Sequence, residues 1–303
     1  MPIGRAAARR LVRKAVGRYM STAPLGRQQQ FNFAISRDVP ASFPEALTHY
    51  AQGTEPIHLE RARRQHETYV STLREFVPTL CLPPLDEHAD SVFVEDTVVA
   101  IGKTAVITNP GHVTRQGEVD TIQDVLSRLG MNVLDMRSDF GDKSELALCD
   151  GGDVLYTGRH LFVGLSKRTN RQAVEVLSQA FDGVTQTIAV PMDGDEALHL
   201  KSVVTHMDSR TIVVPAETWV DDWLHNMSVT KLGYDVIRVP QVEACNIVTV
   251  NQGVLAQDVE CDESRTLLYD AAIERNLQLK FVNTSEMAKC DGALTCCSVL
   301  LSL

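Results

Sequence analysis

Two adjacent cysteines near the end of the chain are the first candidates for chemistry. Cys296 and Cys297 follow the turn dipeptide Asp291-Gly292 and precede an apolar segment that ends near Leu300. This pattern predicts a turn that leads into a buried strand. Neighbouring side chains on a strand point to opposite faces, so one thiol can pack in the core while the other faces a cavity. Buried cysteines are usually core residues, and the alternative hypothesis makes Cys296 a nucleophile.

A cysteine nucleophile needs a proton acceptor, and His199 is the candidate. It lies between Leu198 and Leu200 in the sequence. A single histidine with apolar neighbours is more often a hydrogen-bonded core residue than a catalytic one. Its catalytic role depends on Cys296, because a thiol beside an imidazole forms the usual thiolate pair.

Three acidic residues, Asp90, Glu95 and Asp96, lie within seven positions of one another before an apolar segment. Acids this close together are typical of a solvated turn. Glu95 and Asp96, however, have apolar residues on both sides, where we expect burial rather than a turn. Buried carboxylates need a cation or hydrogen bonds, and a cationic ligand would supply both.

A fourth acid, Asp150, is followed by the paired glycines Gly151 and Gly152. Paired glycines are typical of a tight turn or a bulge. The functional alternative is a backbone that approaches another group closely and places Asp150 at the site. No helix of the phosphate-binding type follows, so a nucleotide-binding loop is not predicted.

Two arginines, Arg115 and Arg168, each begin a predicted helix. A cation is unfavourable beside the positive end of a helix dipole. One interpretation places both guanidinium groups in solvent. The other makes them recognise a carboxylate, for which the planar fork of arginine donors is suited.

The composition excludes several classes of protein. The 303 residues carry a net charge of −10, which disfavours nucleic acid as a partner. The seven cysteines are irregularly spaced and form no Cys-x-x-Cys pair, so neither a zinc knuckle nor a disulfide framework is predicted, and a reducing compartment is favoured. No apolar segment approaches the roughly 18 residues of a membrane span.

The first 37 residues contain eight cations and no acid. On a helical wheel the cations of residues 9–18 share one face, and apolar residues such as Leu11 and Val16 share the other. This pattern is typical of a mitochondrial presequence, with a solvated basic arm or translation from Met20 as alternatives. We therefore expect residues 1–31 to be an extension with a linker, and residues 32–303 to be one domain. The predicted location is mitochondrial, with the cytoplasm as the alternative.

The order of the predicted elements repeats about every 50 residues. Helices are expected to begin near Ala62, Arg115, Arg168, Glu217 and Asp262. Strands are expected after the helices at Asn132–Asp135, Thr187–Val190, Asp235–Val239 and Leu279–Val282, and before them at Val98–Thr108, Val154–Val163, Leu200–Val214 and Ile247–Leu255. Five strand–helix–strand units indicate a cyclic α/β arrangement in which polar residues at strand ends converge on a common centre.

These motifs together resemble the dimethylarginine dimethylaminohydrolases, which belong to the guanidine-modifying enzymes with the pentein fold, a five-bladed α/β propeller. The resemblance runs from about Phe33 to Leu303. Its strongest parts are residues 90–96, 150–170, 198–202 and 291–300, in that order along the chain. It implies hydrolysis of Nω-methylated arginines to citrulline and a methylamine through a covalent intermediate on Cys296.

The resemblance also implies a role for each candidate residue. Cys296 would be the nucleophile, His199 the general acid and base, and Asp150 the acid that orients the histidine. Substrate contacts are implied for Asp90, Glu95, Asp96, Arg115 and Arg168, for the backbone of Cys290, and less firmly for Leu47 in the lid. No cofactor and no metal are required, although zinc bound to Cys296 with His199 would inhibit. The expected partner is the small-molecule substrate alone, and the protein is expected to be a monomer or a homodimer.

The chain departs from the family pattern in the loops at residues 139–148 and 193–197, which are longer than expected. Cys290 stands where an aliphatic residue is usual. Two alternatives use the same residues: a deiminase or amidinotransferase with the same Cys/His site, and a guanidino-binding protein without catalytic activity.

Overall fold

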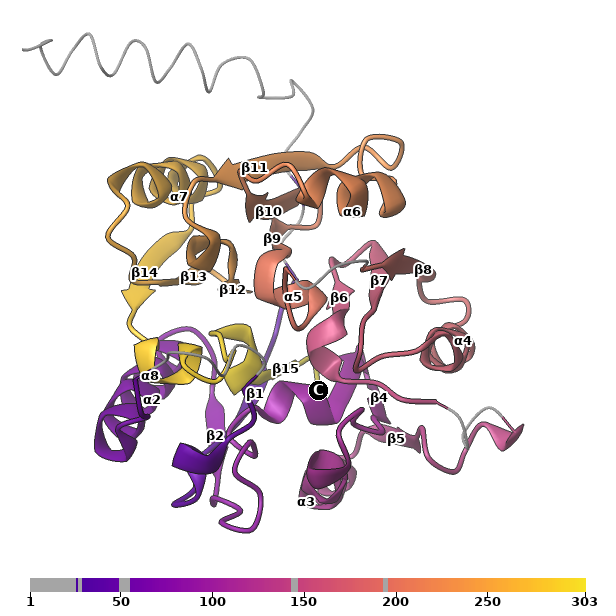
Figure 1. The fold of residues 1–303 in the computed structure, drawn as a ribbon. Helices are drawn as coiled ribbons and strands as arrows, with labels where there is room; N and C mark the ends of the chain where they lie inside the picture. Colours follow the sequence, from indigo (N-terminus) through magenta and orange to yellow (C-terminus); the bar gives the residue numbers. More distant parts are fainter. Residues whose placement is uncertain (1–25, 27–28, 49–54, 143–146, 193–195) are drawn as a thin grey trace, which may run out of the picture.

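The computed structural model describes residue 26 and residues 29–48, 55–142, 147–192 and 196–303. Within these ranges the strands form five separate three-stranded sheets. Figure 1 shows the sheets arranged around a common centre, with helices on the outside of the ring. The five-bladed α/β propeller predicted from the sequence is therefore confirmed.

Each blade repeats one pattern of strand pairing, which the second blade illustrates. Strands β3 (Val98–Ile101) and β4 (Thr104–Ile107) form an antiparallel hairpin. Helix α3 (Val119–Arg128) then crosses over, and β5 (Asn132–Asp135) pairs with β4 in parallel. A parallel strand needs such a crossover because a tight hairpin can join only antiparallel neighbours.

The remaining elements follow the same order. They are β1 (Phe33–Arg37), α2 (Leu59–Arg74), β2 (Thr79–Leu82), β6 (Val154–Tyr156), β7 (His160–Leu165), α4 (Arg171–Ala180), β8 (Gln186–Pro191), β9 (Thr205–Asp208), β10 (Thr211–Pro215), α6 (Val220–Asn226), β11 (Asp235–Val239), β12 (Ile247–Val250), β13 (Gly253–Gln257), α7 (Asp262–Glu274), β14 (Gln278–Val282), α8 (Ser285–Ala288) and β15 (Val299–Leu301).

The first blade closes the ring, because it contains both ends of the described chain. β1 pairs with β2 in parallel and with β15 antiparallel, so the sheet order is β15-β1-β2. Beyond the strands, the Asn32 side chain donates to the carbonyl of Leu303 and accepts from its backbone N–H. This pairing brings the nucleophile region, which lies just before β15, next to the start of the domain.

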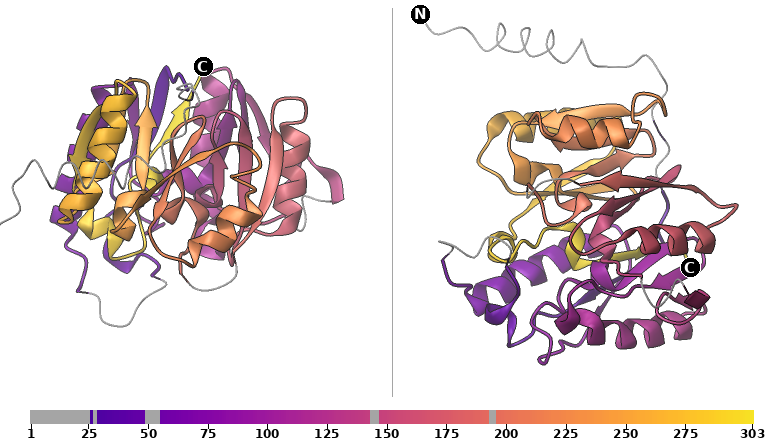
Figure 2. Two further views of the ribbon diagram at one scale, coloured as in Figure 1. Left: turned by 90° about the horizontal axis from the view of Figure 1, so that it is seen from above. Right: turned by 45° about the vertical axis from the view of Figure 1, so that its right-hand side comes forward.

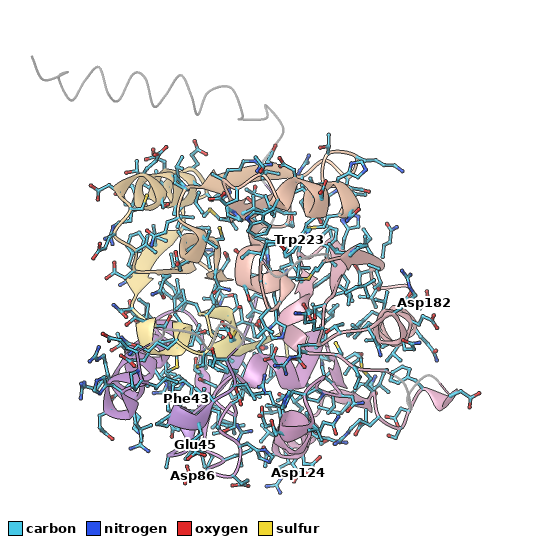
Figure 3. All side chains as sticks on the ribbon, in the orientation of Figure 1. Phe43, Glu45, Asp86, Asp124, Asp182 and Trp223 are labelled. Atoms are coloured by element: carbon cyan, nitrogen blue, oxygen red, sulfur yellow. The ribbon has the colours of Figure 1, made fainter. Side chains whose placement is uncertain are left out.

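Amphipathic sequences explain why the helices cover the sheets. In α3, Val119, Ile122 and Leu126 recur at helical spacing and are fully buried, while Asp124 is exposed. The views in Figure 2 show the helices lying along the outside of the sheets. Figure 3 shows Asp124 and Asp182 on the outer rim of the molecule. The buried apolar residues form five clusters, in keeping with a core shared between neighbouring blades.

Two segments predicted as strands, and a third where no turn was expected, form short helical turns. Residues 200–203 form a short helix, α5 (Leu200–Val203), instead of the start of a strand. Cys296 and Cys297 lie on the 3₁₀-helix η7 (Thr295–Cys297), and β15 begins only at Val299. Glu95 and Asp96 lie on the 3₁₀-helix η2 (Val94–Thr97), although their burial was predicted correctly. All three segments are only three or four residues long, which is too short for periodicity to distinguish a strand from a single buried helical turn.

The predicted helix starts agree to within about three residues for four of the five outer helices. The helix expected near Arg115 begins instead with a 3₁₀-helix, η3 (Val113–Glu118), before α3. Among the described residues, no helix combines the length and the apolar character needed to cross a bilayer. The basic helix expected in residues 1–19 and parts of the two long loops, residues 143–146 and 193–195, lie outside the described residues.

Candidate active site

A cavity of about 350 Å³ lies where the inner ends of the blades meet. Nine of the ten residues assigned to the site from the sequence line it; the exception is Glu95. The lining residues are Leu47, Asp90, Phe93, Asp96, Arg115, Asp150, Arg168, Leu198, His199, Cys290, Asp291, Gly292 and Cys296. These residues are far apart in the sequence, so the ring of blades brings them together as the cyclic arrangement predicts.

The predicted histidine–carboxylate pair is formed. Nε2 of His199 lies 3.0 Å from Oδ2 of Asp150, and both side chains are almost fully buried. The second carboxylate oxygen, Oδ1, accepts a 2.8 Å hydrogen bond from the backbone N–H of Gly111. The backbone N–H of Asp150 donates to the Thr169 hydroxyl. These contacts fix the carboxylate, which in turn fixes the plane of the imidazole.

The charge around His199 favours its protonated form. Burial alone would lower the pKa of His199, but the carboxylates of Asp96, Asp153 and Asp150 outweigh it and raise the pKa to about 9. At neutral pH the imidazole of the free protein is therefore cationic. It can donate a proton before it accepts one.

Asp153 is a site residue that the sequence analysis did not single out. Its Oδ1 accepts from the backbone N–H of Leu200 at 3.0 Å, and its Oδ2 accepts from the Ser166 hydroxyl at 2.6 Å. The first contact holds the beginning of α5, and so the position of His199 just before it. Burial raises the pKa of Asp153 to about 6, although the nearby His199 opposes the rise. The sequence did contain a signal for this residue, because Asp153 is the last residue of the Asp150–Asp153 motif.

The two cysteines have different environments, as expected, although the cause is a 3₁₀-helix. Both thiols belong to the core cluster that contains Tyr69 and Leu73, but Cys296 also lines the cavity, whereas Cys297 is fully buried and does not. Successive residues of a 3₁₀-helix are rotated by about 120°, which separates the two sulfur atoms. Burial, reinforced by the carboxylates of Glu95 and Asp96, raises the pKa of the Cys296 thiol. The free protein therefore holds a neutral thiol near a cationic imidazole.

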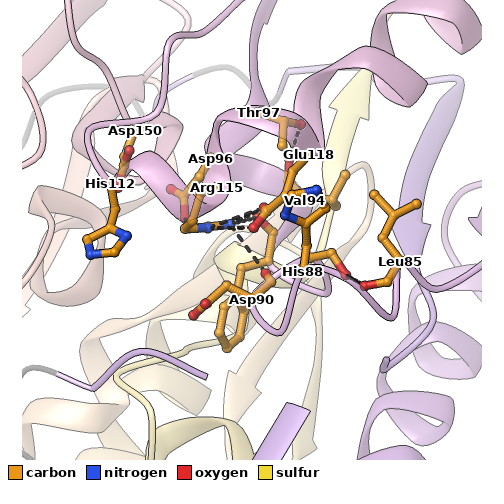
Figure 4. Close-up of polar contacts among 12 residues, drawn as sticks. Leu85, His88, Asp90, Val94, Asp96, Thr97, His112, Arg115, Glu118 and Asp150 are labelled. Carbon is orange, nitrogen blue, oxygen red and sulfur yellow. Dashed lines mark hydrogen bonds and ion pairs between the residues drawn. The ribbon is translucent and has the colours of Figure 1, made fainter. Parts of the chain in front are cut away.

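Arg115 makes contacts that differ from its predicted role. Its Nη1 donates to Oδ2 of Asp96 at 2.5 Å, and its Nε and Nη2 donate to the carboxylate of Glu118. Nη2 also donates to the carbonyls of Asp90 and Phe93. Figure 4 shows the guanidinium group beside the Glu118 carboxylate, with Asp96 adjacent. Arg115 thus orders the acidic side of the cavity, and Glu118 is a further residue that sequence reasoning missed.

The paired glycines allow the backbone to approach the site closely. A Cβ atom on Gly152 would lie 2.7 Å from Nδ1 of His199 and 2.9 Å from Oδ1 of Asp96. The backbone N–H of Gly152 also donates to that same oxygen of Asp96 at 2.8 Å. A side chain at position 152 would therefore displace the imidazole or the carboxylate, which is the functional reason for glycine proposed from the sequence.

Glu95 lies at the boundary between two cavities. Its Oε1 accepts a 2.6 Å hydrogen bond from Nζ of Lys201, a residue to which the sequence analysis assigned no role. It lines a second cavity of about 820 Å³ instead of the first. Burial raises the pKa of Glu95, and Lys201 opposes that rise.

The outer part of the cavity contains the remaining predicted residues. The Asp90 carboxylate accepts from the backbone N–H of Leu47, at 3.2 Å for the closer oxygen. The Cys290 thiol donates to the carbonyl of Met287, and its backbone lies along the cavity wall. Arg168 lines the same cavity and is half-buried. Leu47 is separated by Thr48 alone from residues 49–54, which lie outside the described ranges.

Among the described residues, three side chains could together coordinate a metal ion. Ligand atoms of Asp96, Asp150 and His199 all lie within 4.8 Å of one another. Cys296 is not part of this group, and Arg115 and Gly152 already donate to Asp96. Inhibitory zinc bound by Cys296 stays a prediction.

Comparison with known proteins shows which family the chain belongs to. Residues 39–299 match the family model described as N,N dimethylarginine dimethylhydrolase, eukaryotic. The chain belongs to the dimethylarginine dimethylaminohydrolase family. The resemblance found in the sequence is thereby confirmed, and the chain is an enzyme of the hydrolase class that acts on carbon–nitrogen bonds.

Individual relatives of the family cover most of the chain. The dimethylarginine dimethylaminohydrolase of Streptomyces coelicolor is 31% identical over 255 residues, which cover 80% of this chain and 90% of that protein. A human protein named putative hydrolase DDAH2 is 32% identical over 225 residues, covering 73% and 75%. The Pseudomonas aeruginosa enzyme is 27% identical over 278 residues, covering 89% and 99%.

Solved structures show the same fold at low sequence identity. A mutant of the Pseudomonas aeruginosa enzyme complexed with citrulline superposes with a TM-score of 0.77 at 24% identity, covering 90% of this chain and all of that chain. The N-terminal domain of the cyanobacterial arginine dihydrolase ArgZ, bound to substrate, has a TM-score of 0.73 at 17% identity, covering 89% and 99%.

Proposed function

We propose that this protein hydrolyses Nω-methylated arginines to citrulline and a methylamine or dimethylamine. The observation that carries the proposal is the buried His199–Asp150 pair, which shares one cavity with the Cys296 thiol and the Asp96 carboxylate. Family membership and relatives named for this activity support the choice of substrate. The acidic lining suits a flat cation such as a guanidinium group.

The substrate is oriented by its two charged ends. Asp96 receives the guanidinium N–H groups, since carboxylates bind such a fork by paired hydrogen bonds. A direct substrate contact of Glu95 stays a prediction, because its side chain lines the second cavity and accepts from Lys201. Arg168 binds the α-carboxylate at the outer part of the cavity, where Asp90, Leu47 and the Cys290 backbone position the amino-acid end. Arg115 contributes by holding Asp96 in its ionised form. Burial raises the pKa of Asp96, but His199 and Arg115 outweigh it and lower the pKa to about 2.

The first half-reaction forms a covalent intermediate. The bound guanidinium adds a positive charge beside Cys296 and so lowers the cost of releasing the thiol proton to solvent. The thiolate attacks the central carbon and forms a C–S bond, giving a tetrahedral adduct. Protonated His199 then donates its proton to the methylated nitrogen, the C–N bond breaks, and the neutral amine leaves. Proton donation of this kind contributes roughly 10²–10⁴ in rate.

The second half-reaction uses the same imidazole as a base. Neutral His199, held by Asp150, takes a proton from water as the water oxygen attacks the thiouronium carbon. The C–S bond then breaks with its electron pair on sulfur, and citrulline is released. The hydroxyl group of the adduct loses its proton as the carbonyl of citrulline forms, and the thiolate takes up one proton. His199 is already the imidazolium with which the cycle began.

A citrulline assay on the purified protein tests the proposal, with asymmetric dimethylarginine, monomethylarginine and arginine as substrates. We expect citrulline and an equal amount of amine from the methylated substrates, and little from arginine. Faster release from arginine would identify a deiminase, and transfer of the amidino group to an added amine would identify an amidinotransferase. Calorimetric binding without turnover would identify a guanidino-binding protein.

We also propose that residues 1–19 direct the protein to mitochondria. The support is their basic, acid-free and amphipathic sequence, which lies outside the family match that begins at residue 39. A fluorescent fusion of the full chain should accumulate in mitochondria, and one that begins at residue 31 should remain in the cytoplasm. An unchanged distribution after the truncation would exclude this role.

A further inference from the structure

Asn246 links the two segments that carry the catalytic pair, although it does not line the cavity around them. It lies between the 3₁₀-helix η6 (Val242–Cys245) and strand β12, and only 3% of it is exposed. Its Oδ1 accepts from the backbone N–H of Thr295 at 3.0 Å. Its Nδ2 donates to the Thr295 hydroxyl at 3.1 Å and to the carbonyl of Lys201 at 2.7 Å.

The two partners of Asn246 are the immediate neighbours of the reacting groups. Thr295 is the first residue of η7 and precedes Cys296. Lys201 lies in α5, which begins directly after His199. The start of α5 is held from the other side, where the Leu200 N–H donates to Asp153. The Asn246 side chain therefore connects the segment that carries Cys296 to the segment that carries His199. The second segment is also held by Asp153.

Hydrogen bonds also fix the backbone on both sides of Asn246. The Thr205 hydroxyl donates to the carbonyl of Cys245 at 2.5 Å and lies 3.4 Å from the backbone nitrogen of Ile247. Thr205 begins β9, close behind α5 in the chain. The position of Asn246 is thus determined by the same part of the blade that presents His199.

We propose that Asn246 is a positioning residue, which fixes the distance between the Cys296 sulfur and the His199 imidazole. The inference rests on the proposed function, in which these two groups act in sequence on one carbon atom. This role requires an amide side chain, because its oxygen must accept from the Thr295 N–H and its nitrogen must donate to the Lys201 carbonyl. A carboxylate would place negative charge against the Lys201 carbonyl and would donate nothing.

The Asn246→Asp variant tests this role, with Asn251→Asp as the matched control. Asn251 is also an amide that links separate segments: its Nδ2 donates to the carbonyls of Phe31 and Phe76, and its Oδ1 accepts from the Phe31 N–H. It lies outside the candidate active site. For Asn246→Asp we expect kcat to fall by roughly 10²-fold with KM changed little, since a misplacement of about 1 Å costs that much. For Asn251→Asp we expect kcat to be unchanged.

The pH dependence separates positioning from a loss of stability. In the Asn246→Asp variant, the new carboxyl group can donate to the Lys201 carbonyl when it is protonated, whereas its ionised form cannot. The activity of Asn246→Asp relative to the wild type should therefore rise as the pH falls below about 6, where a buried carboxyl group gains its proton. The activity of the control relative to the wild type should stay flat with pH.

A measurement without substrate keeps this inference separate from the proposed function. Amide hydrogen exchange of the peptide covering residues 291–298 should be faster in Asn246→Asp and in Asn246→Ala, and unchanged in the control. If the wild type turns over no methylarginine, the proposed function is wrong. The hydrogen-exchange result still tests whether Asn246 holds the segment around Thr295 in place. Unchanged exchange in both Asn246 variants, or a kcat loss no larger than in the control, would overturn the proposal.

Discussion

The guanidinium group of Arg115 lies against the carboxylate of Asp96, with Nη1 and Oδ2 separated by 2.5 Å. The same group contacts Glu118, and all three side chains are almost fully buried. An arginine expected from the sequence to bind the substrate carboxylate is part of an internal ion network, and its contact with substrate stays a prediction. Arg115 orients Asp96 and, together with His199, lowers the pKa of its carboxyl group.

Removing Arg115 should therefore damage stability as well as activity. Arg115→Ala removes the cation that pairs with the buried carboxylates of Asp96 and Glu118, which costs roughly 3–5 kcal/mol. Arg137→Ala is the control, because Arg137 pairs with Asp135 and Asp120 near the surface and its loss should cost about 0–1 kcal/mol. Denaturant unfolding of both variants measures the difference. Equal stability losses would show that the buried network contributes no more than a surface pair.

The two adjacent cysteines should respond very differently to substitution. Cys296→Ser should lower citrulline formation by roughly 10³-fold or more, because an alcohol is a far weaker nucleophile at this site. Cys297→Ser should keep most of the activity and lose about 1–3 kcal/mol of stability through a buried hydroxyl group. Steady-state kinetics and thermal unfolding of both variants check this. Comparable activity losses would mean that the nucleophile has been assigned wrongly.

Asp150→Asn should lower kcat while the protein stays folded. The amide keeps the shape of the side chain but removes the charge that helps to hold the imidazole in its cationic form. We expect a loss of roughly 10²–10⁴ in kcat, the range that proton transfer contributes. Asp124→Asn, at an exposed position on α3, should have no effect. An unchanged kcat in Asp150→Asn would show that catalysis does not depend on the His199–Asp150 pair.

The raised pKa of His199 also predicts how stability changes with pH. Because the pKa is about 9 in the folded protein and near its ordinary value of 6.5 when unfolded, protonation favours the folded state. This contribution is complete below about pH 6.5 and is lost as the pH rises through about 9. Unfolding measured from pH 6 to pH 10 should show a larger decrease for the wild type than for His199→Gln. An equal loss of stability with pH in the two proteins would contradict the raised pKa of His199.

Gly152→Ala should affect activity more than stability. The added methyl group would meet the imidazole of His199 and the carboxylate of Asp96, so these groups must move. Gly183→Ala is the control: its surroundings are open, and its φ of +71° makes it cost about 1 kcal/mol in stability alone. Kinetics of the two variants at equal folded fractions separate the effects. A fully active Gly152→Ala would show that the close approach is dispensable.

Much of the fold follows from local pattern. The apolar periodicity of α3 and α4, and the strands after each helix, could be predicted because amphipathic segments must bury one face wherever the chain places them. The types of Cys296 and His199 allowed both a core and a catalytic interpretation, and the roles of Cys296, His199 and Asp150 were implied by the resemblance of four motifs to one enzyme family. The repeat of the units was enough to predict a ring.

Other features depend on contacts between residues far apart in the sequence. Glu118, Lys201 and Asn246 carry no local signal that distinguishes them from surface polar residues. Whether Arg115 binds a substrate or an internal carboxylate depends on which acids the neighbouring blades bring to it. Sequence alone determined the repeating elements and the reactive groups, because both are encoded in spacing and residue type. Only the tertiary structure decided the hydrogen-bond partners, because these depend on directions and distances that arise when the five blades close.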